Sequence, residues 1–169
     1  MSENRSQDIQ LIKLAIQIEK DGIAFFGRFI EKAGEESNLT PFIQQLREEN
    51  QSDQDKLDLL LGPLEAGQTT EKIEDISLDD YVRDMQKARS EKFFAGGRIK
   101  EMFDLFYNPI RLLGCMSETF NELADFYSTN ASNIFYDNEK KAFVEIAANK
   151  KNQADQASKK KKEIIARFP

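Results

Sequence analysis

The sequence predicts an all-α protein in which four long helices form two helical hairpins. Glycine and proline are scarce in the 169-residue chain, at 8 and 4 residues, so few positions interrupt regular structure. Apolar residues recur at alternating steps of three and four, which is the spacing of one helix face. The chain also repeats itself, because the region around Leu46 can be laid over the region around Ile146. These observations together favour a helical bundle with duplicated halves.

The first helix is predicted over residues 6–34. Its sustained apolar stripe consists of Ile12, Ile16, Ile23, Phe26, Ile30 and Ala33. One charged residue, Glu19, lies inside this stripe, where the period calls for an apolar side chain. We therefore expect the Glu19 carboxylate to face the core.

The second helix is predicted over residues 40–61. Thr40 is a suitable N-cap, and Pro41 occupies the first helical position, where its missing N–H costs nothing. Gly62 and Pro63 are expected to end the helix.

The apolar stripe of the second helix is interrupted at its centre. The apolar members of the stripe are Leu39, Ile43, Leu46, Leu57 and Leu60. Where the period calls for two more, the chain has Asn50 and Asp53. A register shifted by one residue would place Glu49 and Ser52 there instead, but the apolar residues on either side favour Asn50 and Asp53. The sequence therefore predicts two buried polar side chains in the middle of this helix.

A long crossover is predicted over residues 62–108. A capping-box pattern opens a helix at about 78–95, which Gly96 and Gly97 end. The aromatic residues of the crossover are Phe93, Phe94, Phe103, Phe106 and Tyr107. Such a cluster could line a ligand pocket, but more often it packs a crossover onto a bundle or forms a dimer contact. We expect packing or dimerisation, although the pattern assigns no function to residues 93–107.

The third and fourth helices are predicted over residues 109–132 and 138–167. Asn108 is a suitable N-cap for the third helix, with Pro109 in its first turn. The third stripe consists of Leu113, Met116, Phe120, Leu123, Tyr127 and Ala131. The fourth stripe consists of Phe143, Ile146, Lys150, Gln153, Ala157 and Ile164. Two polar residues therefore interrupt the fourth stripe as they interrupt the second.

The second hairpin matches the first at this polar interruption. With a shift of about 100 residues, Asn50 and Asp53 align with Lys150 and Gln153. A duplicated helical hairpin joined by one long crossover is the ferritin-like form of the four-helix bundle. We therefore predict a single ferritin-like domain over residues 1–169.

Composition restricts the chemistry that the chain can perform. With no histidine and one cysteine, Cys115, it lacks imidazole catalysis, imidazole metal ligands, thiolate zinc sites and internal disulfides. A net charge of −6 disfavours nucleic acid as a partner. The first residues lack the apolar run of a signal peptide, and no apolar run approaches the length of a membrane span. We expect a cytoplasmic protein with no membrane partner.

Two segments resemble helices of rubrerythrin-type proteins in the ferritin-like superfamily. The segment AIQIEKDGIAFFGRFIEKAG, residues 15–34, is similar to the first helix of that family, which typically reads A-I-x-x-E-K-x-x-x-x-F-Y. The segment FIQQLREENQSDQDKLDLL resembles its second helix, where E-x-x-H follows a leucine and acidic residues. The resemblance is looser in the third and fourth helices, and residues 62–108 match only in length and role. It implies a di-iron centre in the middle of the bundle.

Carried over onto this sequence, the ligand positions of the family fall on Glu19, Asn50, Asp53, Phe120, Lys150 and Gln153. Glu19 retains the residue of the family, and Asp53 still offers a carboxylate. The other positions have lost their ligands, and Lys150 introduces a cation where a di-metal site needs anions. The resemblance therefore implies a degenerate di-iron site, with no catalytic residue and no cofactor.

A polar network is expected to replace the metal site. Because a buried ammonium is costly unless it is paired, we expect Lys150 to pair with Glu19, Asp53 or both. Asn50 and Gln153 would supply hydrogen bonds to the same network. This interpretation predicts a non-catalytic binding or structural protein that forms a homodimer, as related bundles do, with an unidentified protein or small-molecule partner.

A second hypothesis retains a metal. Glu19, Glu49 and Asp53 could form a carboxylate-based site for iron or manganese in a redox protein that acts on oxygen or peroxide. The protein would then be a di-metal oxidoreductase. The other carboxylates of the second helix spread around it and are expected to face water. The lack of histidine and the presence of Lys150 favour the first hypothesis.

Overall fold

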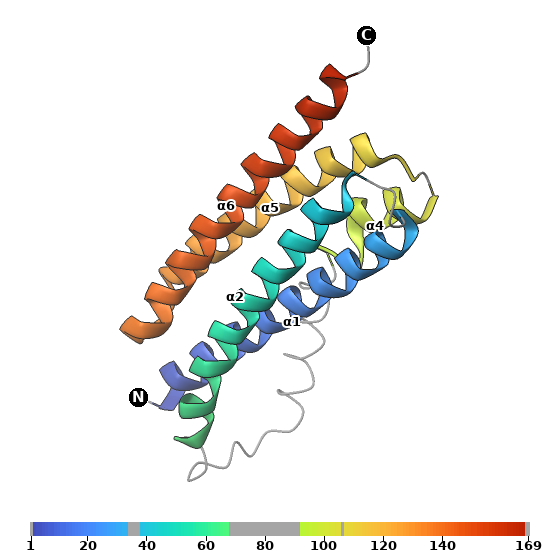
Figure 1. Ribbon diagram of the computed structural model, residues 1–169. Coiled ribbons are helices and arrows are strands. Elements are labelled where there is room, and N and C mark those ends of the chain that lie inside the picture. The colour runs from blue at the N-terminus through green and yellow to red at the C-terminus, as the bar shows by residue number, and fades with distance from the viewer. Residues whose placement is uncertain (1, 34–37, 68–91, 106, 168–169) are drawn as a thin grey trace. The chain divides into compact units, whose positions relative to one another are not determined.

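The computed structural model describes residues 2–33, 38–67, 92–105 and 107–167. These ranges form five helices and contain no strand (Figure 1). The helices are α1 (Ser2–Ala33), α2 (Thr40–Ala66), α4 (Gly97–Leu105), α5 (Pro109–Ala131) and α6 (Asp137–Ala166). The prediction of an all-α protein is therefore confirmed for the described residues.

The chain forms two compact units, Met1–Ala95 and Gly96–Pro169. Each unit contains one of the two expected helical hairpins. In the first unit α2 packs along α1, and in the second unit α6 packs along α5. Figure 1 shows that the two helices of each hairpin run in opposite directions.

Aromatic side chains fill the core of the first unit. Phe25 and Phe26 on α1 are fully buried, and their rings meet edge to face with centroids 5.7 Å apart. Phe94 is also fully buried, and its ring centroid lies 5.6 Å from that of Phe26 and 6.0 Å from that of Phe25. Aromatic pairs of this kind contribute about 0.5–1.5 kcal/mol beyond their buried area. One residue of the predicted aromatic crossover therefore packs against α1.

The start of α2 differs from the prediction. Its N-cap is Leu39 rather than Thr40, and no side chain caps the helix. Leu39 already has helical backbone angles, φ −86° and ψ −23°, and its carbonyl accepts the Ile43 N–H at 2.9 Å. Its side chain is only 4% exposed. Burial of an apolar side chain therefore fixes the start that a threonine hydroxyl was expected to fix, while Pro41 lies in the first turn as predicted.

The end of α2 also differs from the prediction. The helix passes through Gly62 and Pro63 and continues for three more residues. A proline inside a helix removes one backbone hydrogen bond and costs about 3 kcal/mol in an otherwise regular helix. The last turn buries Leu64, which is 8% exposed. Burial of a leucine side chain contributes about 1.5–3 kcal/mol, which offsets most of the cost of the proline.

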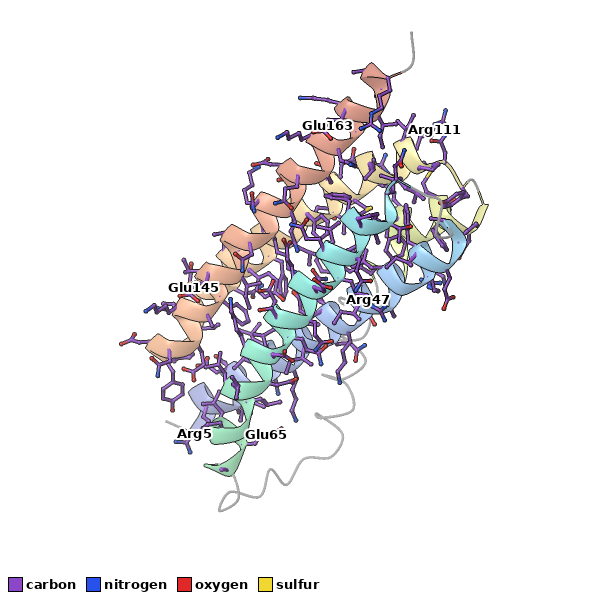
Figure 2. The ribbon with its side chains drawn as sticks, in the orientation of Figure 1. Arg5, Arg47, Glu65, Arg111, Glu145 and Glu163 are labelled. Atoms are coloured by element: carbon purple, nitrogen blue, oxygen red, sulfur yellow. The ribbon has the colours of Figure 1, made fainter. Side chains whose placement is uncertain are left out.

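Polar contacts hold the last turn of α2 against the first part of α1. Arg5 Nη1 donates a hydrogen bond to the carbonyl oxygen of Gly67 at 2.9 Å. Lys13 Nζ lies 3.0 Å from Glu65 Oε1, but both side chains are about half exposed, so this ion pair contributes at most about 1 kcal/mol. Figure 2 shows Arg5 and Glu65 at the same end of the hairpin.

The outer face of α2 is polar. Four glutamines each donate to a carboxylate four residues later, at 3.0–3.5 Å: Gln44 to Glu48, Gln45 to Glu49, Gln51 to Asp55 and Gln54 to Asp58. These bonds lie at the exposed surface, as expected for carboxylates that face water. In the described part of the chain, no helix is both long and apolar enough to cross a membrane.

The described end of the predicted crossover helix, residues 92–95, is not helical. Most of the range 78–95 lies outside the described residues, but residues 92–96 form turns and a bend instead of a helix. Phe93 and Phe94 are 3% and 0% exposed, so the turn buries both of its phenylalanine side chains. The helix that follows is α4, which begins at Gly97 and packs on α5 in the second unit.

In the second unit, α5 begins at the predicted N-cap. The Asn108 side-chain oxygen accepts the N–H groups of Ile110 at 3.0 Å and Arg111 at 3.2 Å. Pro109 lies in the first turn, as predicted. A cap of this kind contributes about 1 kcal/mol to helix stability.

The core of the second unit follows the predicted period. The predicted α5 stripe is at most 5% exposed at every position: Leu113, Met116, Phe120, Leu123, Tyr127 and Ala131. The rings of Tyr127 on α5 and Phe143 on α6 meet edge to face at 5.2 Å. Of the other crossover aromatics, Phe103 and Tyr107 meet edge to face at 5.9 Å, and Phe106 lies outside the described residues.

Candidate functional site

The first unit buries a polar layer in the middle of its hairpin. Glu19 on α1 and Asn50 on α2 are fully buried, and Asp53 is 2% exposed. Glu49 is only half-buried and Ser52 is exposed. The structure therefore places Asn50 and Asp53, and not the shifted register, on the buried face of α2.

Gly22 allows this layer to close. A Cβ atom at Gly22 would lie 2.5 Å from Asn50 Nδ2 and 3.0 Å from Phe94 Cε2. Such a distance is shorter than van der Waals contact permits, so only glycine lets α2 approach α1 here without movement. The Asn50 amide is consequently enclosed beside the Phe94 ring and has almost no contact with solvent.

Asp53 lies at the edge of this layer. Its Oδ2 atom is shielded from solvent, whereas Oδ1 lies 4.0 Å from the Lys56 ammonium on the same helix. The Lys56 side chain is 43% exposed, so its ammonium group is hydrated and its ion pair with the buried Asp53 carboxylate is weak.

The second unit buries a different pair at the corresponding positions. Lys150 on α6 is fully buried, and Gln153, three residues later, is 1% exposed. Phe120 on α5 is also fully buried. Moving an ammonium out of water costs several kcal/mol unless counter-charges and acceptors surround it. The buried Lys150 ammonium therefore requires acceptors or counter-charges around it.

The predicted network joins residues from both units. Each unit buries its own members, Glu19, Asn50 and Asp53 in the first and Lys150 and Gln153 in the second. The pairing of Lys150 with Glu19 or Asp53 stays a prediction from the sequence.

Sequence reasoning missed four buried polar residues. Asp8 is fully buried, and Thr119, Asn130 and Glu139 are each 8% exposed. Asp8 lies four residues before Ile12, so the helical period of α1 contained the signal for its burial. Glu139 lies in the first turn of α6, where a carboxylate interacts favourably with the helix dipole.

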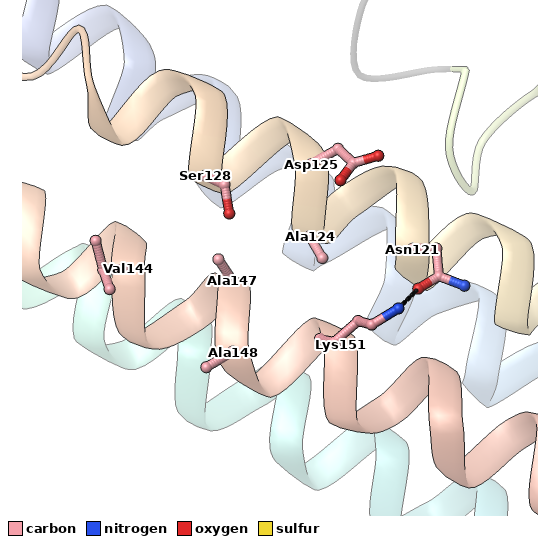
Figure 3. Close-up of a pocket in the computed structure, with 8 residues that line it drawn as sticks. All are labelled: Asn121, Ala124, Asp125, Ser128, Val144, Ala147, Ala148 and Lys151. Atoms are coloured by element: carbon pink, nitrogen blue, oxygen red, sulfur yellow. Dashed lines mark hydrogen bonds between the residues drawn. The ribbon is translucent and has the colours of Figure 1, made fainter.

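A surface pocket that the sequence did not reveal lies between α5 and α6 (Figure 3). Its volume is about 510 Å³, and it is lined by Asn121, Ala124, Asp125, Ser128, Val144, Ala147, Ala148 and Lys151. Lys151 Nζ donates to Asn121 Oδ1 at 2.9 Å and closes one end of the pocket. The small alanine side chains create the space, and polar and charged side chains share the lining with them.

Cys115 is half-buried in α5. Burial raises the pKa of its thiol, and the nearby Glu118 carboxylate raises it further, against the opposite effects of Arg98 and Lys161. A raised pKa keeps the thiol protonated and poorly nucleophilic at neutral pH. Cys115 therefore lacks the environment of a catalytic cysteine.

No group of three or more aspartate, glutamate, cysteine or histidine side chains within the described ranges could hold a metal ion. Glu49, the third member of the hypothetical carboxylate site, accepts a hydrogen bond from Gln45 at 3.1 Å at the exposed surface. It does not share the burial of Glu19 and Asp53.

Comparison with known proteins adds no family assignment. No family model, curated protein or solved structure matches this chain. Its relation to rubrerythrin-type proteins therefore stays a prediction based on the motifs of its helices.

Proposed function

We propose that this chain is a ferritin-like, rubrerythrin-related protein that has lost its di-iron site and acts as a non-catalytic binding or structural protein. Two features support the proposal. The motif around Glu19 resembles the first helix of that family. In addition, each hairpin carries a buried polar pair three residues apart in its second helix, Asn50 with Asp53 and Lys150 with Gln153.

The observation that carries the proposal is the burial of Lys150, which has no solvent exposure. In a di-iron member of the family, the hairpin at this place supplies a glutamate and a Glu-x-x-His pair. Here α5 and α6 offer Phe120, Lys150 and Gln153 at those positions. A phenyl ring cannot ligate a metal, and an ammonium repels one. This half of the site does not fit iron.

The other half of the site retains too little negative charge. Glu19 and Asp53 are its two carboxylates, and Asn50 is a neutral amide. Two divalent metals carry about four positive charges, which carboxylate-rich ligand sets offset. Two carboxylates together with one lysine cation leave a net charge of about −1, so the donor set suits an ion-pair network better than a metal pair.

The retained polar layer has a physical role in this proposal. Buried polar groups favour one helix register because any slip leaves them unsatisfied, and in some proteins this specificity is their main effect. We propose that Glu19, Asp53 and Lys150 fix the register of the helices in this way. The protein would act as a homodimeric scaffold or binding protein for a protein or small-molecule partner.

A second candidate function is a residual metal-binding or redox protein. The observation in its favour is the burial of two carboxylates, Glu19 and Asp53, on the facing helices of one hairpin. Buried carboxylates attract cations, and iron and manganese accept oxygen ligands. In this alternative Asp53 would be an essential ligand.

Metal analysis of the full-length purified protein tests the proposal. The protein is loaded anaerobically with ferrous iron, desalted, and assayed for bound metal and for iron-dependent oxygen consumption. We expect substoichiometric iron and no oxygen consumption above the buffer rate. About two bound metals per chain with turnover would establish the alternative. Asp53→Asn should then abolish binding, whereas Asp55→Asn, on the exposed face of the same helix, should not.

A further inference from the structure

One face of α6 carries charged residues at positions that are symmetric about Ala148. Asp137, Lys141, Ala148, Asp155 and Lys159 are all exposed. Their spacings of four, seven, seven and four residues return them to the same side of the helix, because seven residues make about two turns and eleven make about three. They therefore form one continuous stripe along α6.

The charges in this stripe reverse sign about Ala148. Lys141 and Asp155 each lie seven residues from Ala148 and carry opposite charges. Asp137 and Lys159 each lie eleven residues from Ala148 and are also opposite. When two identical helices cross antiparallel at Ala148, every charge in the stripe of one copy faces the opposite charge in the other. The stripe is therefore complementary to itself.

We propose that a second copy of this chain docks antiparallel along this face of α6, with a two-fold axis at Ala148. The inference rests on the homodimer of the proposed function and assigns its interface. Most homodimers are isologous, so that the same surface is used twice and must be self-complementary. The stripe about Ala148 meets that requirement, with a small side chain where the two helices approach most closely.

Apolar surface beside the stripe strengthens the proposal. Val144 is 55% exposed and projects at the edge of the pocket between α5 and α6 (Figure 3). In the antiparallel arrangement, Val144 of one copy lies beside the Lys151 end of the pocket of the other copy. Each copy would bury one valine in its partner.

Pairing within α6 is the simpler explanation of these charges, because residues four apart on a helix also attract. Asp137 with Lys141 and Asp155 with Lys159 have that spacing in the favourable order, acid before lysine, but the structure shows no ion pair for either among the described residues. Lys141 with Glu145 and Lys151 with Asp155 have it in the less favourable order. Lys151 instead donates to Asn121 on α5. No ion pair found among the described residues involves Lys141, Glu145 or Asp155. Their charges remain available to a second copy.

A cysteine placed on the proposed axis tests the geometry. In the full chain with Cys115→Ser, Ala148→Cys should form an intermolecular disulfide under mild oxidation, because a two-fold axis brings the two Cα atoms within the 4.4–6.8 Å that a disulfide needs. Lys159→Cys is the matched control. It lies on the same stripe but about 33 Å from its counterpart in the dimer, and should not cross-link.

Charge reversal tests the pairing independently. Lys141→Glu places like charges at two symmetric positions and should raise the dimer dissociation constant at least about tenfold. Adding Asp155→Lys to the same chain should restore the original affinity, because positions 141 and 155 then carry opposite charges again, with their signs exchanged. Lys100→Glu, an exposed lysine on α4 with the same charge change, is the control. Sedimentation velocity at low salt measures all three variants.

The outcomes separate the interface from the homodimer. A dimer that Ala148→Cys cross-links and Lys141→Glu weakens supports the proposal. A dimer without the cross-link, and insensitive to Lys141→Glu, overturns this interface but not the homodimer. A monomer at all accessible concentrations overturns both. The proposal that the protein has lost its di-iron site would be unaffected, because the metal analysis tests it separately.

Discussion

Gly22 on α1 and Asn50 on α2 approach so closely that a methyl group on Gly22 would lie 2.5 Å from the Asn50 amide nitrogen. At this contact α1 and α2 pack closely enough to keep the polar layer of the first unit away from solvent. It explains why a glycine occurs in the middle of a helix, where it costs about 1 kcal/mol relative to alanine.

Gly22→Ala should therefore destabilise the protein, although alanine is the better helix former. The clash with Asn50 and Phe94 requires one of them to move within a packed core, which typically costs 1–3 kcal/mol. Gly27→Ala on the same helix is the control, because a Cβ there meets only the end of the Arg47 side chain at 3.4 Å. It should stabilise by about 0.5–1 kcal/mol. Urea unfolding of both variants and of the unsubstituted protein measures the change in the free energy of unfolding.

Lys150→Met should reveal whether the buried ammonium is compensated by a buried carboxylate. Removing one member of a buried ion pair leaves the other uncompensated and costs about 3–5 kcal/mol. Adding Asp53→Asn should recover part of that loss if these two residues pair, as the sequence predicts. Lys151→Met, at the exposed neighbouring position, should change stability by less than about 1 kcal/mol. Equal, small effects at both lysines would contradict the proposed network.

Asn108→Ala should shorten or fray the start of α5. The substitution removes the side-chain acceptor of the Ile110 and Arg111 N–H groups and should cost about 1 kcal/mol. Asn138→Ala, in the first turn of α6 but after its Tyr136 N-cap, should stay within about 0.5 kcal/mol. Thermal unfolding distinguishes the two variants, and similar losses would mean that Asn108 does not act as a cap.

The Cys115 thiol should react slowly at neutral pH. Because burial and Glu118 both raise its pKa, the thiolate fraction at any given pH is smaller than for an ordinary thiol. Alkylation rates should therefore reach half their maximum at a higher pH. Glu118→Gln removes the repulsive carboxylate, which lowers the pKa and speeds alkylation at neutral pH. Glu122→Gln, an exposed neighbour on α5, should leave the profile unchanged.

The helical period predicted the interior of α5 fully, but that of the other helices only in part. In the predicted stripes of α1, α2 and α6, five members are only half-buried: Ile23, Ile30, Ala33, Leu60 and Ile164. Every predicted member of the α5 stripe is buried, and the interruption at Asn50 and Asp53 is buried as well. Periodicity succeeds here because each helix buries one continuous face, and the side chains of that face can be read three and four residues apart.

The helix ends and the chemistry of the site were harder to predict. Pro63 is a strong local stop signal, but the burial of Leu64, which depends on the partner helix, overrides it. Gly22 was not recognised as part of the site, because its importance comes from Asn50 across the hairpin. Local patterns carry no information about such tertiary contacts.

The proline inside α2 divides that helix energetically. Pro63 has no N–H to donate to the Leu59 carbonyl oxygen, so the final turn is joined to the rest of α2 by one hydrogen bond fewer than in a regular helix. That turn can open without the rest of the hairpin, as local segments of low stability do. Amide hydrogen exchange should accordingly be fast at residues 64–66 and slow around Asn50. Pro63 would then separate a stable central part of α2 from a last turn that opens locally.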